Sequence, residues 1–248
     1  MDIPRIFTIS ESAHRIHNPF TPEKYATLGH VLRMKPGTRI LDLGSGSGEM
    51  LCTWARDYGI SGVGIDMSQL FSKQAKLRAE ELGVTDRVDF IHNDAAGFVA
   101  DEKYHVAACV GATWIAGGVA GTIKLLEKSL KHGGMILIGE PYWLQQPTTE
   151  EIARACGATC IADFLTLNGL VTFFDQLDYD VVEMVLADQE GWDRYEAAKW
   201  LTMRHWLAEN PDDEFAEEVR TALTISPKRH VTYTREYLGW GVFVLMAR

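Results

Sequence analysis

Short apolar runs alternate with helical segments along most of the chain. Between the runs, apolar residues recur every three or four positions, as they do on one face of a helix. The runs predict strands at 39–43, 62–66, 88–92, 105–110, 135–139, 179–186 and 241–246. The helical spacing predicts helices at 22–34, 49–58, 69–82, 122–130 and 167–177. Strands that alternate with helices in this way form an α/β fold with a mostly parallel sheet and helices on both faces.

The first predicted strand ends in a glycine-rich turn. Gly44, Gly46 and Gly48 follow the apolar run 39–43, and helical spacing begins directly after them. A turn of this kind lets a ligand approach the backbone closely. Asp66 ends the next apolar run, where we expect a carboxylate at the strand tip that can accept hydrogen bonds from a ribose diol. The pattern therefore predicts a nucleoside site.

Two kinds of nucleoside ligand use a strand, a glycine-rich turn and a ribose-binding acid. A dinucleotide site has the spacing G-x-G-x-x-G, whereas this chain has G-x-G-x-G. Asp42 precedes the turn and Glu49 follows it, so two carboxylates flank the place where an anionic pyrophosphate would bind. S-adenosylmethionine has no phosphate and carries a sulfonium and an ammonium, so it suits an acidic turn. An NAD-dependent oxidoreductase is the weaker alternative, and an ordinary strand–helix turn is another.

The run Leu41–Gly48 (LDLGSGSG) closely resembles the first motif of the class I S-adenosylmethionine-dependent methyltransferases. The resemblance implies a Rossmann-like, doubly wound sheet of seven strands, mostly parallel, with the last strand antiparallel beside the sixth. It implies S-adenosylmethionine as cofactor and S-adenosylhomocysteine as product. Separately, the Cys156/Cys160 spacing is not C-x-x-C and no histidine pair lies nearby, so buried thiols are a better interpretation than a metal site. Asp42 would act on the methionine ammonium, Asp66 on the ribose and Asp94 on the adenine amino group. The implied cofactor-binding residues are Asp42, Gly44, Ser45, Gly46, Gly48, Asp66, Met67, Asp94, Ala95, Val110 and Gly111.

The resemblance also organises the chain into one methyltransferase domain spanning 1–248. Residues 36–186 and 240–248 would form the core sheet, 1–35 an N-terminal cap and 188–237 a helical insertion. We expect the cap, the insertion and a shorter inserted stretch at about 144–166 to act as lid segments over the reactive methyl and to form the acceptor pocket.

Aromatic residues raise two further questions about the acceptor pocket. The insertion carries a stripe at helical spacing, formed by Trp192, Tyr195, Trp200, Met203 and Trp206. Such a stripe is more often core packing than a lid. Trp114, after the fourth strand, either walls the acceptor pocket or covers the sheet edge.

The function that follows is methyl transfer from S-adenosylmethionine to a small-molecule acceptor by in-line displacement. The donor is already activated, so the protein mainly aligns the nucleophile and excludes water. A hydroxyl or protonated amine acceptor also needs a general base, for which Glu140 and His17 are the catalytic candidates, followed by His14 and His205. Alternatively, Glu140 pairs with an arginine, and the histidines near Arg15 lie on a solvated surface. A non-catalytic module that binds S-adenosylmethionine is the alternative function.

Composition and charge narrow the class of protein. Of the 248 residues, 46% are hydrophobic and 23% charged, as in ordinary soluble globular proteins. The net charge of -10 argues against a nucleic-acid partner, because a phosphate-binding groove needs clustered Lys and Arg. No apolar run approaches the roughly 20 residues of a membrane span, and the N-terminus lacks a secretory signal. We therefore expect a cytoplasmic protein without membrane contact; the oligomeric state, the acceptor and the atom methylated stay open.

Overall fold

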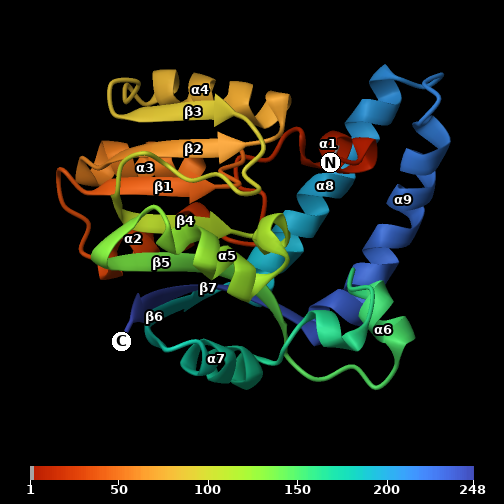
Figure 1. The fold of residues 1–248 in the computed structure, drawn as a ribbon. Helices are drawn as coiled ribbons and strands as arrows, with labels where there is room; N and C mark the ends of the chain where they lie inside the picture. The colour runs from red at the N-terminus through yellow and green to blue at the C-terminus, as the bar shows by residue number, and fades with distance from the viewer. Residues whose placement is uncertain (1–2) are drawn as a thin grey trace.

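A computed structural model describes residues 3–248, and its centre is a seven-stranded sheet (Figure 1). The strands are β1 (Arg39–Leu43), β2 (Ser61–Asp66), β3 (Val88–His92), β4 (Tyr104–Val110), β5 (Leu130–Trp143), β6 (Tyr179–Leu186) and β7 (Leu238–Ala247). Their order in the sheet is β3-β2-β1-β4-β5-β7-β6. β7 runs antiparallel to its neighbours β5 and β6, whereas the pairs among β1 to β5 are parallel. The structure confirms the expected sheet, including the antiparallel last strand beside the sixth.

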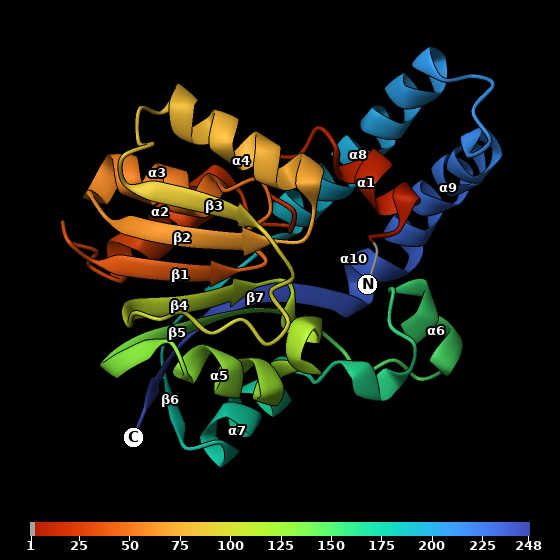
Figure 2. The ribbon, with the colours of Figure 1, turned by 45° about the horizontal axis from the view of Figure 1, so that its top comes forward.

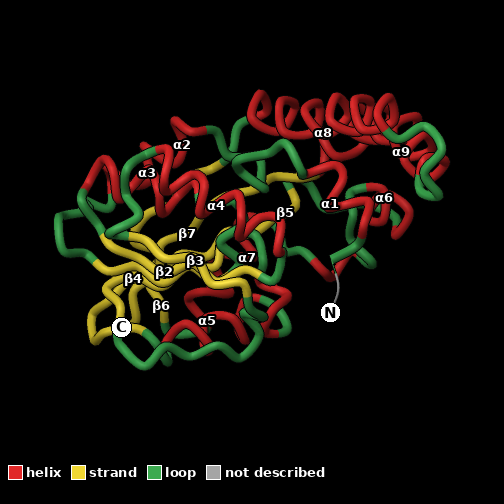
Figure 3. Tube along the Cα trace, turned by 90° about the horizontal axis from the view of Figure 1, so that it is seen from above, coloured by secondary structure: helices red, strands yellow, loops and turns green. Residues whose placement is uncertain are grey.

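Helices cover both faces of this sheet. The α-helices of residues 3–248 are α1 (Arg5–Glu11), α2 (Pro22–Val31), α3 (Glu49–Tyr58), α4 (Gln69–Glu81), α5 (Val119–Glu127), α6 (Glu150–Ala155), α7 (Leu167–Gln176), α8 (Gln189–Glu209), α9 (Ala216–Arg229) and α10 (Arg235–Tyr237). Helices α2, α3 and α4 pack on one face, and α5 and α7 on the other (Figure 3). No helix among residues 3–248 is long and apolar enough to cross a membrane.

Both faces of the central strands are buried, which explains why those strands are nearly continuous apolar runs in the sequence. Ile40 points into the core shared with α2, α3 and α4, and Leu41 into the core shared with α5 and α7; both are fully buried. Successive side chains of a strand point to opposite faces, so a sheet covered on both sides needs apolar residues at nearly every position.

A third apolar cluster joins the N-terminal helix to the helical insertion. Ile9 of α1, Met203 and Leu207 of α8, and Ala216 and Val219 of α9 are buried together. Figure 2 shows α1, α8 and α9 side by side, beyond the end of the sheet at which β1 to β4 terminate. The cluster therefore holds the N-terminal segment beside the carboxyl ends of the strands, the edge at which ligands bind in open α/β sheets.

Strand β5 differs most from its expected bounds. It was expected at 135–139, but it runs from Leu130 to Trp143. β7 pairs with it as far as Leu238 opposite Trp143, and this antiparallel pairing extends the strand at its C-terminal end. At the other end, Leu130 pairs with Tyr104 of β4. Helix α5 correspondingly ends at Glu127, before the expected end at residue 130.

Candidate functional site

Three glycines build the turn after β1. Gly44, Gly46 and Gly48 have φ angles of 80°, 52° and 73°, a left-handed conformation that glycine adopts without strain. A Cβ at Gly46 would lie 2.6 Å from Cδ2 of His17, and one at Gly48 would lie 2.6 Å from Cζ of Phe90. Gly46 therefore admits a neighbouring side chain to the turn, whereas Gly48 lets α3 pack closely on the sheet.

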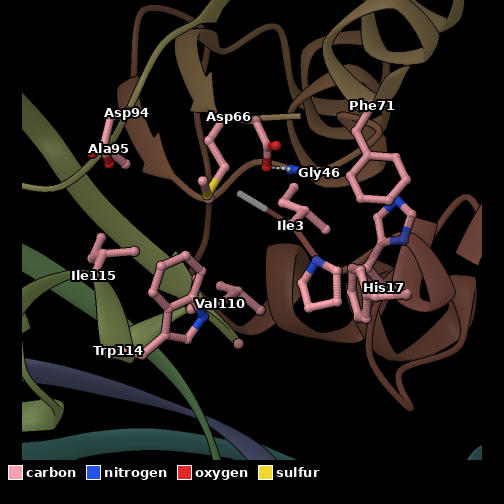
Figure 4. Close-up of a pocket in the computed structure, with 16 residues that line it drawn as sticks. Ile3, His17, Gly46, Asp66, Phe71, Asp94, Ala95, Val110, Trp114 and Ile115 are labelled. Carbon is pink, nitrogen blue, oxygen red and sulfur yellow. Dashed lines mark hydrogen bonds between the residues drawn. The ribbon is translucent and has the colours of Figure 1, made fainter. Parts of the chain in front are cut away.

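Two cavities meet at this turn. The larger has a volume of about 310 Å³, and its walls come from the N-terminal segment, the tips of β1 to β4 and the loop after β4 (Figure 4). The smaller has a volume of about 30 Å³ and lies between residues 15–18 and the start of α3. Both are lined by His17, Gly44, Gly46 and Val110, so the glycine turn connects them.

Asp66 ends β2 at the wall of the larger cavity and is buried. Its Oδ2 accepts a hydrogen bond from the Gly46 amide, drawn in Figure 4, and its Oδ1 accepts one from the Ser68 amide, each at 2.8 Å. Burial raises the pKa of Asp66, while the two amide hydrogen bonds oppose this rise. The amides fix the carboxylate in place, and each oxygen keeps a second lone pair for a ligand.

Asp42 of β1 lines the smaller cavity and is only 4% exposed. Its Oδ1 has no hydrogen-bond partner among residues 3–248. Burial, and then the nearby charge of Asp66, raise the pKa of Asp42 to about 7. A buried carboxylate oxygen without a partner is costly, so this position is suited to a ligand that supplies a cation or an N–H donor.

Glu49 makes a smaller electrostatic contribution than its place after the turn suggested. Its Oε2 accepts a hydrogen bond from Nε of Arg78 at 2.7 Å, and its Oε1 accepts one from Nη2 at 2.9 Å. This two-point ion pair largely offsets the charge of Glu49. The expectation that two carboxylates repel an anion at the turn therefore needs correction, because of these two carboxylates only Asp42 has a buried oxygen without a hydrogen-bond partner in residues 3–248.

The other expected cofactor residues lie around the same two cavities, with one exception. Met67, Asp94, Ala95, Val110 and Gly111 line the larger cavity. Ser45 lines the smaller one. Within residues 3–248, Gly48 lines neither cavity, and its conformation serves the packing of α3 instead.

Glu140 is set back from the cavities, behind the loop that follows β4. Its Oε2 accepts a hydrogen bond from Oγ1 of Thr113 at 2.7 Å, and burial raises its pKa to about 7 while that bond opposes the rise. In the described structure it lines neither cavity, and its hydrogen-bond partner is Thr113 rather than an arginine. Glu140 therefore supports the turn Thr113–Ala116, which carries Trp114 and Ile115 into the larger cavity.

His17 is clamped between the N-terminal helix and the glycine turn. Its Nδ1 lies 3.2 Å from Oε2 of Glu11, and its Nε2 lies 2.8 Å from Oγ of Ser47. Its ring also packs on Phe71, with centroids 4.1 Å apart. Glu11 is fully buried, and no local sequence signal distinguishes it from a surface acid.

Hydrogen bonds engage both ring nitrogens of His17. Gln74 donates through Nε2 to the Ser12 carbonyl and accepts through Oε1 from the Ser47 hydroxyl. Gln74 thus fixes the Ser47 side chain that lies against Nε2 of His17, while Glu11 lies against Nδ1. His17 therefore connects the N-terminal helix to the glycine turn.

The residues near His17 are less solvated than the sequence suggested. The side chain of His14 is only 7% exposed, and its Nε2 lies 3.2 Å from the Tyr195 carbonyl. The surface interpretation is wrong for His14 and His17. It is right for Arg15, which pairs with Glu81 at 3.0 Å while half exposed.

The aromatic stripe of α8 packs in apolar clusters, as the favoured interpretation predicted, and the N-terminal segment lies at the larger cavity. Among residues 3–248, no side chain of α8 lines either cavity, and Trp192 packs in the main core while Trp200 packs on the third cluster. Three apolar residues of the N-terminal segment, Ile3, Pro4 and Phe7, line the larger cavity instead. The sequence pattern of these three residues did not indicate that they line a cavity, because α1 reaches the site only through its packing in the third cluster.

Comparison with known proteins agrees with this geometry. A family described as "Methyltransferase domain" matches residues 40–134. An uncharacterized protein of Escherichia coli K12, YjhP, is 78% identical over 248 residues, which is 100% of both chains. A solved S-adenosylmethionine-dependent methyltransferase from Geobacter sulfurreducens, in complex with S-adenosyl-L-homocysteine, is 73% identical, with a TM-score of 0.98 and coverage of 100% of this chain and 99% of that one.

A second solved methyltransferase gives the same result. The S-adenosylmethionine-dependent methyltransferase from Thiobacillus denitrificans, also in complex with S-adenosyl-L-homocysteine, is 70% identical, with a TM-score of 0.98 and full coverage of both chains. The high identities over whole chains agree with the glycine turn, the strand-tip acids and the sheet order described above. The chain is a member of the class I S-adenosylmethionine-dependent methyltransferase family.

Proposed function

We propose that the protein binds S-adenosylmethionine across the two cavities and transfers its methyl group to a small-molecule acceptor. The adenosine lies in the larger cavity, with its ribose on Asp66 and its adenine beside Asp94 and Ala95. The methionine part passes over the glycine turn into the smaller cavity, where its ammonium pairs with Asp42. Residues 3–35 and 188–237 belong to the same domain as the sheet and form its N-terminal cap and its helical support.

The observation that carries this proposal is the unpaired Oδ1 of Asp42. It is buried beside the glycine turn, and the described residues offer it no hydrogen-bond donor. An ammonium group would both satisfy the oxygen and compensate the charge. A dinucleotide would bring a pyrophosphate to the same turn, where the Asp42 carboxylate opposes it. The site therefore favours a cationic nucleoside over NAD.

The reaction needs alignment more than acid–base groups. The methyl is attached to a sulfonium, which is already a good leaving group, so the protein gains most by holding the nucleophile in line and excluding water. We assign Glu140 and His17 positioning roles, because Glu140 supports the Thr113–Ala116 turn and both His17 nitrogens are engaged. A cytoplasmic location and the absence of a nucleic-acid partner remain part of the proposal, the latter supported by the net charge of -10.

Calorimetry and methyl transfer together test this function. We expect S-adenosylmethionine and S-adenosylhomocysteine to bind the folded protein at one site, NADH not to bind, and Asp42→Ala to weaken both bound ligands at least about tenfold. Donor labelled in its methyl group, incubated with the protein and a metabolite extract, should transfer label to low-mass products. Binding without transfer would favour the non-catalytic module, and absence of binding would overturn the proposal.

A further inference from the structure

Two buried polar groups at the smaller cavity each have an unused hydrogen-bonding site. Oδ1 of Asp42 has no hydrogen-bond donor among residues 3–248, and Tyr25 lines the same cavity while only 6% exposed. The Tyr25 hydroxyl accepts a hydrogen bond from Nδ2 of Asn18 at 3.0 Å, but its own hydrogen has no acceptor in the described residues. A buried acceptor and a buried donor therefore lie at one small cavity without bonding to each other.

Asn18 fixes the role of the Tyr25 hydroxyl. Oδ1 of Asn18 accepts from the Phe20 amide at 3.0 Å, so its amide nitrogen is the atom that points to Tyr25. Because that nitrogen can only donate, the phenol oxygen is the acceptor of this bond and its hydrogen stays available for another partner. Burial raises the pKa of Tyr25, the Asn18 bond lowers it and the charge of Asp42 raises it, so the hydroxyl keeps its proton at neutral pH.

Neighbouring groups that could attract an anion are engaged elsewhere. The amides of residues 44–46 each donate to an acceptor on β2. Arg15 also lines the smaller cavity, but its guanidinium pairs with Glu81 at 3.0 Å and is half exposed, so solvent and the paired charge weaken its pull on a further anion. Tyr25 therefore offers a buried, unengaged donor to an anionic group beside Asp42.

The methionine end of S-adenosylmethionine carries both complementary groups on one carbon. Under the proposed function its α-ammonium binds the Asp42 carboxylate. The α-carboxylate is attached to the same carbon, so it enters the smaller cavity together with the ammonium. A carboxylate has only acceptor sites, and a hydrogen bond to it from a neutral donor is charge-assisted and stronger than one between neutral groups.

Resting on the proposed function, we propose that Tyr25 donates a hydrogen bond to the α-carboxylate of S-adenosylmethionine and thereby selects ligands that carry this carboxylate. Asp42 then binds the positive charge of the methionine end, and Tyr25 binds its negative charge. Asn18 is a positioning residue, because it holds the phenol oxygen and leaves the hydrogen for the ligand. A ligand without the carboxylate leaves the buried Tyr25 hydrogen without an acceptor, and this penalty provides the discrimination.

Two ligands test this selection. S-adenosylhomocysteine carries both the ammonium and the carboxylate, whereas its decarboxylated form keeps the ammonium and the thioether nucleoside. Calorimetry on the full chain gives Kd for each. We expect the unaltered protein to bind S-adenosylhomocysteine at least about tenfold more tightly than the decarboxylated form. Tyr25→Phe should weaken binding of S-adenosylhomocysteine about tenfold and of the decarboxylated form less than about threefold.

Two further variants serve as controls. Within residues 3–248, Tyr58 lines neither cavity, and its hydroxyl donates to the Ala26 carbonyl at 3.1 Å. Tyr58→Phe should therefore change neither affinity by more than about threefold. Arg15→Gln removes the alternative anchor for the carboxylate and should leave the preference for S-adenosylhomocysteine in place.

The pattern across these variants decides the inference. Equal weakening of both ligands in Tyr25→Phe would show a merely structural role and overturn it. A preference that is absent from the unaltered protein, survives in Tyr25→Phe or disappears in Arg15→Gln would also overturn it. Failure of the unaltered, folded protein to bind S-adenosylhomocysteine would instead overturn the proposed function.

Discussion

His17 Nδ1 lies 3.2 Å from Oε2 of Glu11, and this buried pair joins the N-terminal helix to the glycine turn. The other carboxylate oxygen of Glu11 accepts from the Tyr195 hydroxyl at 2.7 Å and lies 3.4 Å from Nζ of Lys199, both on α8. Burial raises the pKa of Glu11, but the contacts with His17, Lys199 and His14 lower it by more. The net result is a pKa lowered to about 2. One carboxylate therefore ties together the cap, the insertion and the site.

Replacing Glu11 tests whether this carboxylate holds the cap over the cavity. We expect Glu11→Gln to lower the free energy of unfolding by about 3 kcal/mol at pH 7, because it leaves buried cationic partners without a counter-ion. The folded-state pKa of about 2 lies below the ordinary 4.5, so the contribution of Glu11 is full above pH 4.5 and is lost as pH falls toward 2. Urea unfolding at pH 7 and pH 3 should show the deficit shrinking at the lower pH.

A surface ion pair provides the control for the Glu11 variant. Asp175 pairs with Arg248 at 2.6 Å, but both side chains are about half exposed. Asp175→Asn should cost less than about 1 kcal/mol. Hydrogen exchange should accelerate in residues 3–17 only for Glu11→Gln; equal exchange in both variants would contradict the assigned role.

Donor binding should depend on pH through Asp42. Its pKa of about 7 means that the carboxyl is largely protonated at pH 6, whereas an ammonium ligand requires the carboxylate. Affinity for S-adenosylhomocysteine should therefore fall by up to about tenfold per pH unit below 7. Titrations at pH 6 in buffers of different ionisation enthalpy should detect close to one proton released per ligand. A pH-independent affinity between 5.5 and 7.5 would exclude an ionic role for Asp42.

The same residue should destabilise the ligand-free protein at high pH. Since the folded-state pKa of about 7 exceeds the ordinary 3.8, stability is lost as pH rises from 3.8 through 7. Asp42→Asn removes the buried charge and should raise the free energy of unfolding at pH 8 by on the order of 2 kcal/mol. Thermal unfolding at pH 4 and pH 8 measures this, and a gain at pH 4 as large as at pH 8 would contradict it.

Gly46 should be irreplaceable for steric as well as conformational reasons. A Cβ there would lie 2.6 Å from the ring of His17, which hydrogen bonds hold on both sides. Gly46→Ala should reduce affinity for S-adenosylhomocysteine more than about tenfold and destabilise the fold by about 2 kcal/mol. Gly83→Ala also places alanine at a positive φ, of 64°, but nothing lies within 4 Å of its Cβ. It should cost only about 1 kcal/mol and leave binding unchanged.

Glu140 and Thr113 distinguish a supporting carboxylate from a general base. Glu140→Gln keeps an oxygen that accepts from Thr113 Oγ1, so label transfer from the methyl-labelled donor should fall less than about fivefold. Thr113→Val removes the donor and should lower label transfer by several-fold, because the turn carrying Trp114 loosens. A loss of more than about a hundredfold in kcat for Glu140→Gln would identify a base instead.

The central strands and the cofactor acids were predictable because their signals are local. The runs 39–43, 88–92 and 179–186 were recognised with the bounds that the structure gives. Strand 39–43 is a central parallel strand with an almost wholly buried run, whereas 88–92 and 179–186 are edge strands in which buried and exposed positions alternate. The family motif then placed Asp42 and Asp66 at the tips of neighbouring strands, where the structure has them.

Contacts between distant segments lacked such signals. Glu11 is polar and lies between polar neighbours, so nothing nearby indicates that α8 will bury it. Glu49 pairs with Arg78 of another helix, so its charge is offset by a residue far away in the sequence. The C-terminal bound of β5 depends on pairing with β7 at the end of the chain.

By itself, the sequence determined the sheet, the glycine turn and the two carboxylates of the donor site, because periodicity and backbone conformation are properties of adjacent residues. The tertiary structure alone decided that Ile3 and Phe7 wall the cavity, that His17 is clamped between Glu11 and Ser47 and that Glu140 supports Trp114 from outside it. These outcomes depend on which segments pack together after the chain folds, and burial and hydrogen-bond partners are fixed only at that stage.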